Sequence, residues 1–211
     1  MVISEIPLWF YGLASIGYGS TAIICFLVGF FAFRGYRKTS MQPLLLLAFG
    51  FLALGLGFVA LTIPSAYAYL VLELYRQTFI SINEVNYQGF SWYYVLSLFA
   101  YVLFALMYLP NLPKSRFWVI FVPLWYANAS WFHIISLILL LFILIQTVIN
   151  SFRRRSLNSY LVTFAFFSLS IFHLLLFLTT FSVTIFFIGY VFLIVGALSL
   201  LLMLIRVNYR G

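Results

Sequence analysis

Long apolar runs separated by short polar segments make up almost the whole chain. Most of the runs approach the ~20 residues that a helix needs to cross a bilayer. They predict membrane-spanning helices over residues 8–33, 42–63, 91–109, 115–126, 131–149, 160–178 and 182–205. We therefore expect an all-α, polytopic transmembrane bundle of seven spans that forms one domain over residues 1–211.

The segment between the second and third spans is the longest polar stretch. Pro64 ends the apolar run before it, and its first half keeps a helical pattern. This predicts a helical segment over about 65–90 on the outer side, with Glu73, Arg76 and Glu84 on its surface. We expect this segment to supply the main outward contact surface.

The region 117–150 decides the number of spans. As a single helix it would be about 50 Å long, against a ~30 Å hydrocarbon core. A break at 126–130, which also contains the glycosylation sequon Asn128-Ala129-Ser130, divides it into two spans. The alternative is six spans plus a re-entrant segment at 117–126, because this piece is short and contains Pro123.

The distribution of charge favours seven spans. With seven spans, all three acidic residues lie on one side, and ten of the eleven basic residues lie on the other. Those basic residues are Arg34, Arg37, Lys38, Lys114, Arg116, Arg153, Arg154, Arg155, Arg206 and Arg210. Basic residues mark the cytoplasmic side of a membrane protein. The pattern therefore predicts the N-terminus outside and the C-terminus inside.

The composition excludes whole classes of protein. Hydrophobic residues make up 66% and charged residues 7%, against ~45–50% and ~25% in soluble domains. This excludes a soluble enzyme, a disordered tail and a nucleic-acid-binding module, although the net charge is +8. The predicted environment is the lipid bilayer of the cell membrane.

The predicted spans carry almost no groups for catalysis. They contain no acidic residue, and the seventh lacks the lysine that a retinal protein needs. The sequence also lacks the short motifs of zinc proteases, serine hydrolases and phosphate-binding loops. We therefore expect no enzymatic activity and assign no catalytic residue.

Small residues form a stripe on the second span. Gly50, Ala53 and Gly57 lie on one helical face, and small residues allow transmembrane helices to approach closely. We expect this stripe to pack inside the bundle.

Weak internal similarity suggests three spans, a linking span and three more spans. Ala48-Phe49 matches Ala165-Phe166 at a spacing of 117 residues, and Tyr94-Val95 matches Tyr190-Val191 at a spacing of 96. Parallel repeats of this kind occur in transporters. Chance matching between apolar helices remains the alternative explanation.

Two histidines are the sharpest candidates for a site. His133 and His173 both fall in the outer halves of neighbouring spans, where they could hold haem b or a metal ion. Counted from the helix ends, however, their heights differ by about 6 Å, and the predicted outer loops offer few partners for haem propionates. We predict no cofactor and two neutral histidines hydrogen-bonded to neighbouring groups such as Ser136, Ser168 or Ser170.

Several segments carry a family resemblance. The segment FRGYRKTS at 33–40, the run 44–57, SIFHLL at 170–175 and the run 196–207 resemble small uncharacterised archaeal seven-span integral membrane proteins. The resemblance implies an archaeal source. It carries over no catalytic residue, because that group has no settled activity.

Together these features favour a non-catalytic membrane component, either a receptor-like sensor or the anchoring subunit of a larger complex. Such a chain has little extramembrane mass and would act through a protein partner in the membrane. Two alternatives stay open: a small-solute transporter with the three-one-three repeat, and a haem-bearing electron-transfer subunit that uses His133 and His173.

Overall fold

The structure is a computed structural model that describes residues 8–75, 79–108, 129–178 and 183–210. This part of the chain forms helices and no strands. The helices are α1 (Leu8–Thr39), α2 (Gln42–Tyr75), α3 (Phe79–Leu106), α4 (Ala129–Arg154), α5 (Leu157–Leu178) and α6 (Val183–Arg210). All six are long and apolar enough to cross a membrane, so the chain is a multi-pass membrane protein. The predicted span 115–126 lies outside the described residues.

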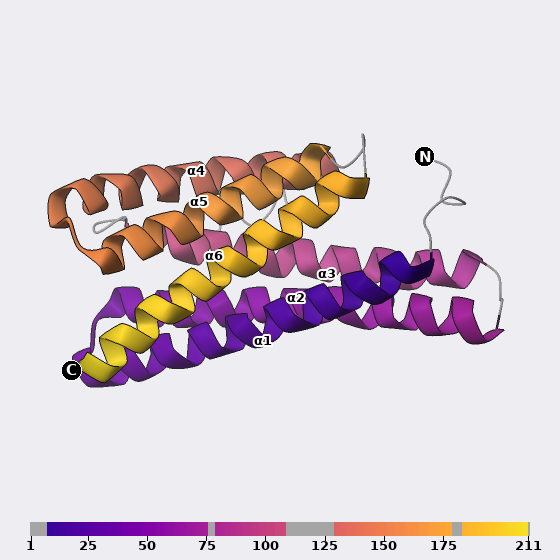
Figure 1. Cartoon of the computed structure of the whole chain (residues 1–211), viewed down its shortest axis with the longest axis horizontal. Helices are drawn as coiled ribbons and strands as arrows, with labels where there is room; N and C mark the ends of the chain where they lie inside the picture. The colour runs from indigo at the N-terminus through magenta and orange to yellow at the C-terminus, as the bar shows by residue number, and fades with distance from the viewer. Residues whose placement is uncertain (1–7, 76–78, 109–128, 179–182, 211) are drawn as a thin grey trace, which may run out of the picture.

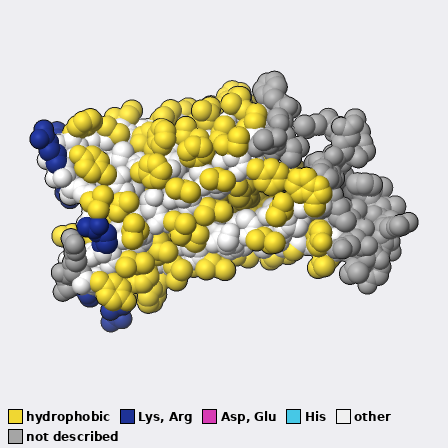
Figure 2. Space-filling view, viewed as in Figure 1, with side chains coloured by type: hydrophobic (Ala, Val, Ile, Leu, Met, Phe, Trp, Pro, Cys, Tyr) yellow, Lys and Arg dark blue, Asp and Glu magenta, His cyan; other side chains and the backbone are white. Residues whose placement is uncertain are grey.

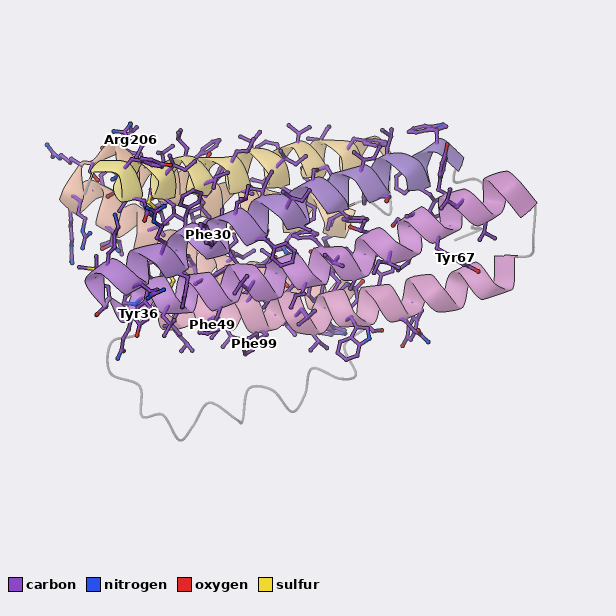
Figure 3. The ribbon with its side chains drawn as sticks, turned by 90° about the horizontal axis from the view of Figure 1, so that it is seen from below. Phe30, Tyr36, Phe49, Tyr67, Phe99 and Arg206 are labelled. Atoms are coloured by element: carbon purple, nitrogen blue, oxygen red, sulfur yellow. The ribbon has the colours of Figure 1, made fainter. Side chains whose placement is uncertain are left out.

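The helices pack as a ring. Each one contacts the next along the chain, and α6 contacts α1. Figure 1 shows α1, α2 and α3 in one layer and α4, α5 and the start of α6 in the other; α6 then crosses obliquely to the C-terminal end of α1. The face of the bundle seen in Figure 2 is largely apolar, and Phe30, Phe49 and Phe99 project outward from α1, α2 and α3 (Figure 3). Apolar faces of this kind suit contact with lipid tails.

Helices α3 and α4 run in the same direction. Near the start of α4, Phe132 stacks on Tyr94 with ring centroids 4.1 Å apart. At the other end, Tyr108, just beyond α3, lines a cavity together with Arg154 at the end of α4. The end of α3 and the start of α4 therefore lie at opposite ends of the bundle (Figure 1).

Helix α2 continues past the residue at which the sequence predicted its end. It runs through Pro64 to Tyr75, giving 34 residues, or about 50 Å at the helical rise. A proline leaves the carbonyl four residues earlier without its helical partner, here the carbonyl of Ala60. Gly89 of α3 packs directly against Pro64 and this carbonyl, where a Cβ would overlap both. Glycine at position 89 therefore lets α3 pack closely against α2 at its proline.

The outer segment predicted over 65–90 is divided between two helices. Residues 65–75 belong to α2, and residues 79–90 belong to α3. Figure 1 shows these ends of α2 and α3 projecting beyond the α4–α6 layer. The side chains of Glu73, Arg76 and Glu84 lie outside the described part of the structure.

Two tight turns of the same kind join α1 to α2 and α4 to α5. Ser40 and Arg155 adopt the left-handed backbone conformation, with φ of 55° and 44°. Their amides donate to the carbonyls of Tyr36 and Ser151, which closes each preceding helix. The two turn residues lie 115 positions apart in the sequence.

The same spacing of 115 residues relates α2 to α5. It pairs Phe51 with Phe166 and Leu54 with Leu169, and all four side chains are buried. It also pairs exposed positions with exposed positions, as in Phe49 with Phe164. The two helices therefore present matching faces to the core.

This register corrects the one expected from sequence identity. A spacing of 117 pairs Phe49, which is 51% exposed, with Phe166, which is fully buried. The match Ala48-Phe49 to Ala165-Phe166 is therefore wrong by two residues. For α3 and α6, by contrast, a spacing of 96 does pair like environments: Phe104 and Leu200 are both buried, and Val95 and Val191 are both exposed.

The small-residue stripe of α2 faces α3 of the same chain. A Cβ at Gly50 would overlap the Phe104 ring, and a Cβ at Gly57 would lie 3.3 Å from the Tyr93 ring. Ala53, on the same stripe, is buried. The described contacts of this stripe therefore lie within the bundle.

Every Lys and Arg side chain that the structure describes lies at one end of the bundle, where α1, α4 and α6 finish (Figure 2). This end also holds the polar contacts that join α6 to α1. Asn208 Nδ2 donates to the carbonyl of Phe31 at 3.2 Å, and Lys38 Nζ donates to the carbonyl of Asn208 at 3.3 Å. We call this end of the bundle, where α1, α4 and α6 finish, the basic end. Lys114 and Arg116 lie outside the described residues.

Candidate functional site

Three side chains from three helices form a hydrogen-bonded chain inside the bundle. The Tyr101 hydroxyl of α3 lies 2.6 Å from His173 Nε2 of α5. His173 Nδ1 in turn lies 3.2 Å from His133 Nδ1 of α4. Tyr101 and His173 are fully buried, whereas His133 is only partly buried near the start of α4. We call these three residues the Tyr–His–His cluster.

The protons of the cluster can be arranged in only two ways while every ring stays neutral. Either Tyr101 donates to His173 and His173 Nδ1 donates to His133, or each bond runs in the opposite direction. A neutral imidazole has one donor and one acceptor nitrogen, so reversing one bond reverses the other. The cluster is therefore a single cooperative unit that links α3, α4 and α5.

Buried hydroxyls without a well-formed hydrogen bond surround the cluster. Tyr93 and Ser97 lie eight and four residues before Tyr101 on α3, so the three share one helical face. Ser136 follows His133 by one turn of α4. Among the described residues, the hydroxyls of Tyr93, Ser97 and Ser136 make no hydrogen bond of good geometry, although that of Tyr93 lies near those of Ser97 and Tyr101. Buried polar groups are usually paired with protein or water, so these hydroxyls mark a place that water or a polar ligand would satisfy.

Aromatic rings enclose this polar centre. The His173 ring lies 5.6 Å from the Phe132 ring and 5.3 Å from the Phe172 ring, between centroids. The Tyr94 ring covers Phe132 on the other side. The described charged side chains all lie at the basic end, so the centre offers uncharged donors and acceptors in an apolar surround.

The structure brings the two predicted histidines together, but not with the predicted partners. They bond to each other, and His173 also bonds to Tyr101, while the Ser170 hydroxyl bonds to the Phe166 carbonyl of its own helix. The expected 6 Å difference in height is wrong, because the two Nδ1 atoms lie 3.2 Å apart. Counting from helix ends ignored the tilt and the offset of neighbouring helices.

Sequence reasoning missed Tyr101. The chain has 15 tyrosines, most of which suit the membrane interface or lipid-facing positions. The available signal was the spacing of Tyr93, Ser97 and Tyr101, which places three polar groups on one stripe of a transmembrane helix.

No family model, curated protein or solved structure matches the chain. The resemblance to small archaeal membrane proteins therefore stays a prediction. The site has to be interpreted from its own geometry.

Proposed function

We propose that the chain is a small-solute transporter built from two three-helix units, α1–α3 and α4–α6. The main support is the spacing of 115 residues between α2 and α5, which relates both their buried faces and the turns before them. Transporters built from parallel repeats bind their solute near the middle of the membrane, between the repeats. The Tyr–His–His cluster lies between the two units, because Tyr101 belongs to the first and both histidines belong to the second.

The chemistry of the cluster suggests the class of solute. A small, uncharged molecule with hydrogen-bonding groups would pair with the open hydroxyls of Tyr93, Ser97 and Ser136. An ion would find no opposite charge among the described side chains around it. Movement of one unit against the other would break the bond between Tyr101 and His173, so a solute bridging these groups would be coupled to that movement.

We further propose seven crossings, with the N-terminus outside and the C-terminus inside. The support is the common direction of α3 and α4: the chain between them has to return from the basic end to the opposite end. We propose that this return is a seventh crossing. The basic end then faces the cytoplasm, in agreement with the positive-inside rule.

This topology predicts where two reporters will be found. A reporter inserted at 76–78, between α2 and α3, should be outside, and one fused after Gly211 should be cytoplasmic. Accessibility to a membrane-impermeant thiol reagent would measure both, with the native Cys25, which is buried, replaced by serine. Finding both reporters on the same side would rule out the seven-crossing topology.

Transport can be tested with purified protein in liposomes. We expect at least one neutral polar solute among urea, glycerol, a neutral sugar and a neutral amino acid to enter these liposomes faster than it enters liposomes without protein. Light scattering would measure the rate of entry. Tyr101→Phe should reduce this entry by about tenfold, because one lost hydrogen bond of ~1.4 kcal/mol corresponds to that factor.

The matched control is Tyr160→Phe. It is the same chemical change at an exposed position near the start of α5, so it should leave the rate unchanged. If no solute in the panel enters faster with protein present, or if both variants lower the rate equally, the transporter proposal fails.

The second candidate is the non-catalytic sensor or anchoring subunit expected from the sequence. The observation that favours it is the projecting hairpin of α2 and α3, which extends beyond the α4–α6 layer and could hold a partner (Figure 1). Purification from native membranes would test it, since an anchoring subunit should bring a second protein in fixed stoichiometry.

The same purification tests the haem alternative. The two imidazole rings already touch through their Nδ1 atoms, so a haem held between them would require α4 and α5 to separate. We therefore expect no Soret band. A Soret band that disappears in both His133→Ala and His173→Ala would instead support an electron-transfer subunit.

A further inference from the structure

A cavity with both polar and apolar walls opens at the basic end, where four helices meet. Its volume is about 300 Å³, and it lies between the start of α2, the end of α3, the last turns of α4 and the first turns of α5. Its lining residues are Pro43, Met107, Tyr108, Thr147, Asn150, Arg154, Ser159 and Val162. The cavity is separate from the Tyr–His–His cluster, since the two share no residue.

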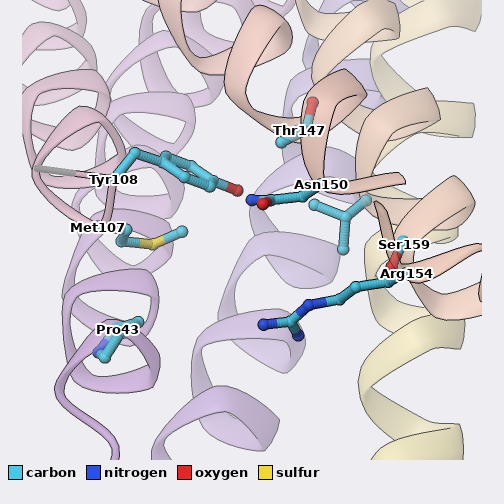
Figure 4. Close-up of a pocket in the computed structure, with 8 residues that line it drawn as sticks. Pro43, Met107, Tyr108, Thr147, Asn150, Arg154 and Ser159 are labelled. Carbon is cyan, nitrogen blue, oxygen red and sulfur yellow. The ribbon is translucent and has the colours of Figure 1, made fainter. Parts of the chain in front are cut away.

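The polar groups that line the cavity come from different elements. Thr147, Asn150 and Arg154 follow one another at spacings of three and four residues, so they form one face of α4. Ser159 lies on the first turn of α5, and Tyr108 just beyond α3. Figure 4 shows the Tyr108 hydroxyl and the Asn150 amide pointing toward one another, with the Arg154 side chain extending below them.

These groups fit an anion with several acceptor oxygens. The Arg154 guanidinium, the Asn150 amide and the Tyr108 hydroxyl supply donors, and none of the eight lining residues is acidic. The other two hydroxyls are already bonded, that of Thr147 to the Leu144 carbonyl and that of Ser159 to Ser156. The Arg154 guanidinium also acts on Tyr108: it lowers the pKa of this hydroxyl, although burial has the larger effect and raises that pKa to about 12. Tyr108 therefore stays protonated at neutral pH and can donate a hydrogen bond.

We propose that this cavity binds a phosphate group, with Arg154 as its charged ligand and Asn150 and Tyr108 as hydrogen-bond donors. Guanidinium groups bind phosphate through paired, charge-assisted hydrogen bonds. The cavity is at the basic end and has apolar walls at Pro43, Met107 and Val162, so the phosphate could be the headgroup of an anionic phospholipid. It could equally be a soluble phosphate compound from the aqueous side.

The proposal gives Arg154 a role that its neighbours lack. If the only effect of these three arginines were to set the topology, replacing Arg153, Arg154 or Arg155 would have the same effect on phosphate binding. Of the three, only Arg154 lines the cavity. Arg153→Gln is therefore a control that removes the same charge from the same helix end.

Binding can be measured on detergent-purified, delipidated full-length protein. Native mass spectrometry would count bound phosphatidylglycerol, and a thermal-shift titration would measure inorganic phosphate and pyrophosphate. We expect Arg154→Gln to weaken binding by about tenfold or more, and Arg153→Gln to change it less than twofold. Asn150→Leu, which keeps every charge, should also weaken binding.

The outcomes separate the two sources of phosphate. Selective loss of phosphatidylglycerol in Arg154→Gln and Asn150→Leu supports a lipid headgroup, whereas selective loss of pyrophosphate or phosphate binding supports a soluble ligand. Equal effects of Arg153→Gln and Arg154→Gln, or no binding of any of the three probes by the wild type, would overturn the proposal. Neither readout depends on transport, so this result stands apart from the proposed function.

Discussion

Replacing Gly50 with alanine should destabilise the bundle by about 1–3 kcal/mol, the usual cost of forcing extra atoms into a packed core. The new Cβ would overlap the Phe104 ring of α3. That ring cannot move away freely, because it also packs against Phe51 at 4.8 Å and Phe166 at 5.7 Å between centroids. The free energy of unfolding can be measured by denaturant titration in mixed micelles.

Gly19→Ala is the matched control. A Cβ at Gly19 would meet only Thr62, at an ordinary distance of 3.6 Å. Alanine is a better helix former than glycine by up to about 1 kcal/mol, so this variant should be neutral or more stable. A smaller side chain at 104 should also relieve the clash, making Gly50→Ala less costly in a Phe104→Leu background. Equal costs in both backgrounds would show that the clash with Phe104 is not the cause.

The second large effect is expected from His173→Phe. The spacing of 115 residues pairs His173 of α5 with Phe58, which is buried on α2. The substitution therefore places on α5 the residue type that α2 has at the equivalent position. It would fill most of the same space but leave Tyr101 and His133 without their bonds. Hydrogen bonds between transmembrane helices average about 0.6 kcal/mol, with a maximum near 1.7. We therefore expect a loss of about 1–3 kcal/mol in the free energy of unfolding.

The double variant shows whether the cluster acts as one unit. Tyr101 and His133 both bond to His173 and not to each other. If the two hydrogen bonds are cooperative, Tyr101→Phe should therefore cost clearly less in a His133→Phe background than in the wild type. Full additivity of the two single variants would contradict the linked arrangement of protons described for the cluster.

Much of the fold could be predicted from the sequence because the bilayer constrains it strongly. A run of about 20 apolar residues has few stable arrangements in lipid other than a helix. Six of the predicted spans therefore correspond to described helices. The ends of the helices were less predictable. Helix α2 passes through Pro64, where Gly89 of α3 packs against it, and this contact depends on tertiary structure.

The register and the site were harder to predict for the same reason. Matching Ala48-Phe49 to Ala165-Phe166 by identity gave a register two residues away from the one defined by burial. The location of His133 and His173 toward the ends of α4 and α5 that lie away from the basic end could be inferred from their sequence positions, but their contact depends on how α4 and α5 are offset. Tyr101 could be assigned to the site only from the structure, in which its hydroxyl reaches His173 of α5.

The ring of helices also has a consequence for how the protein is made. Membrane helices emerge from the ribosome in order, and α6 is the last of the six described helices. Until α6 inserts, α1 has no neighbour on the side where Asn208 later bonds to Phe31. The face of α1 that later contacts α6 therefore stays uncovered until α6 inserts. Removing the C-terminal residues that make this contact would leave the same face exposed, where cellular quality control can recognise it.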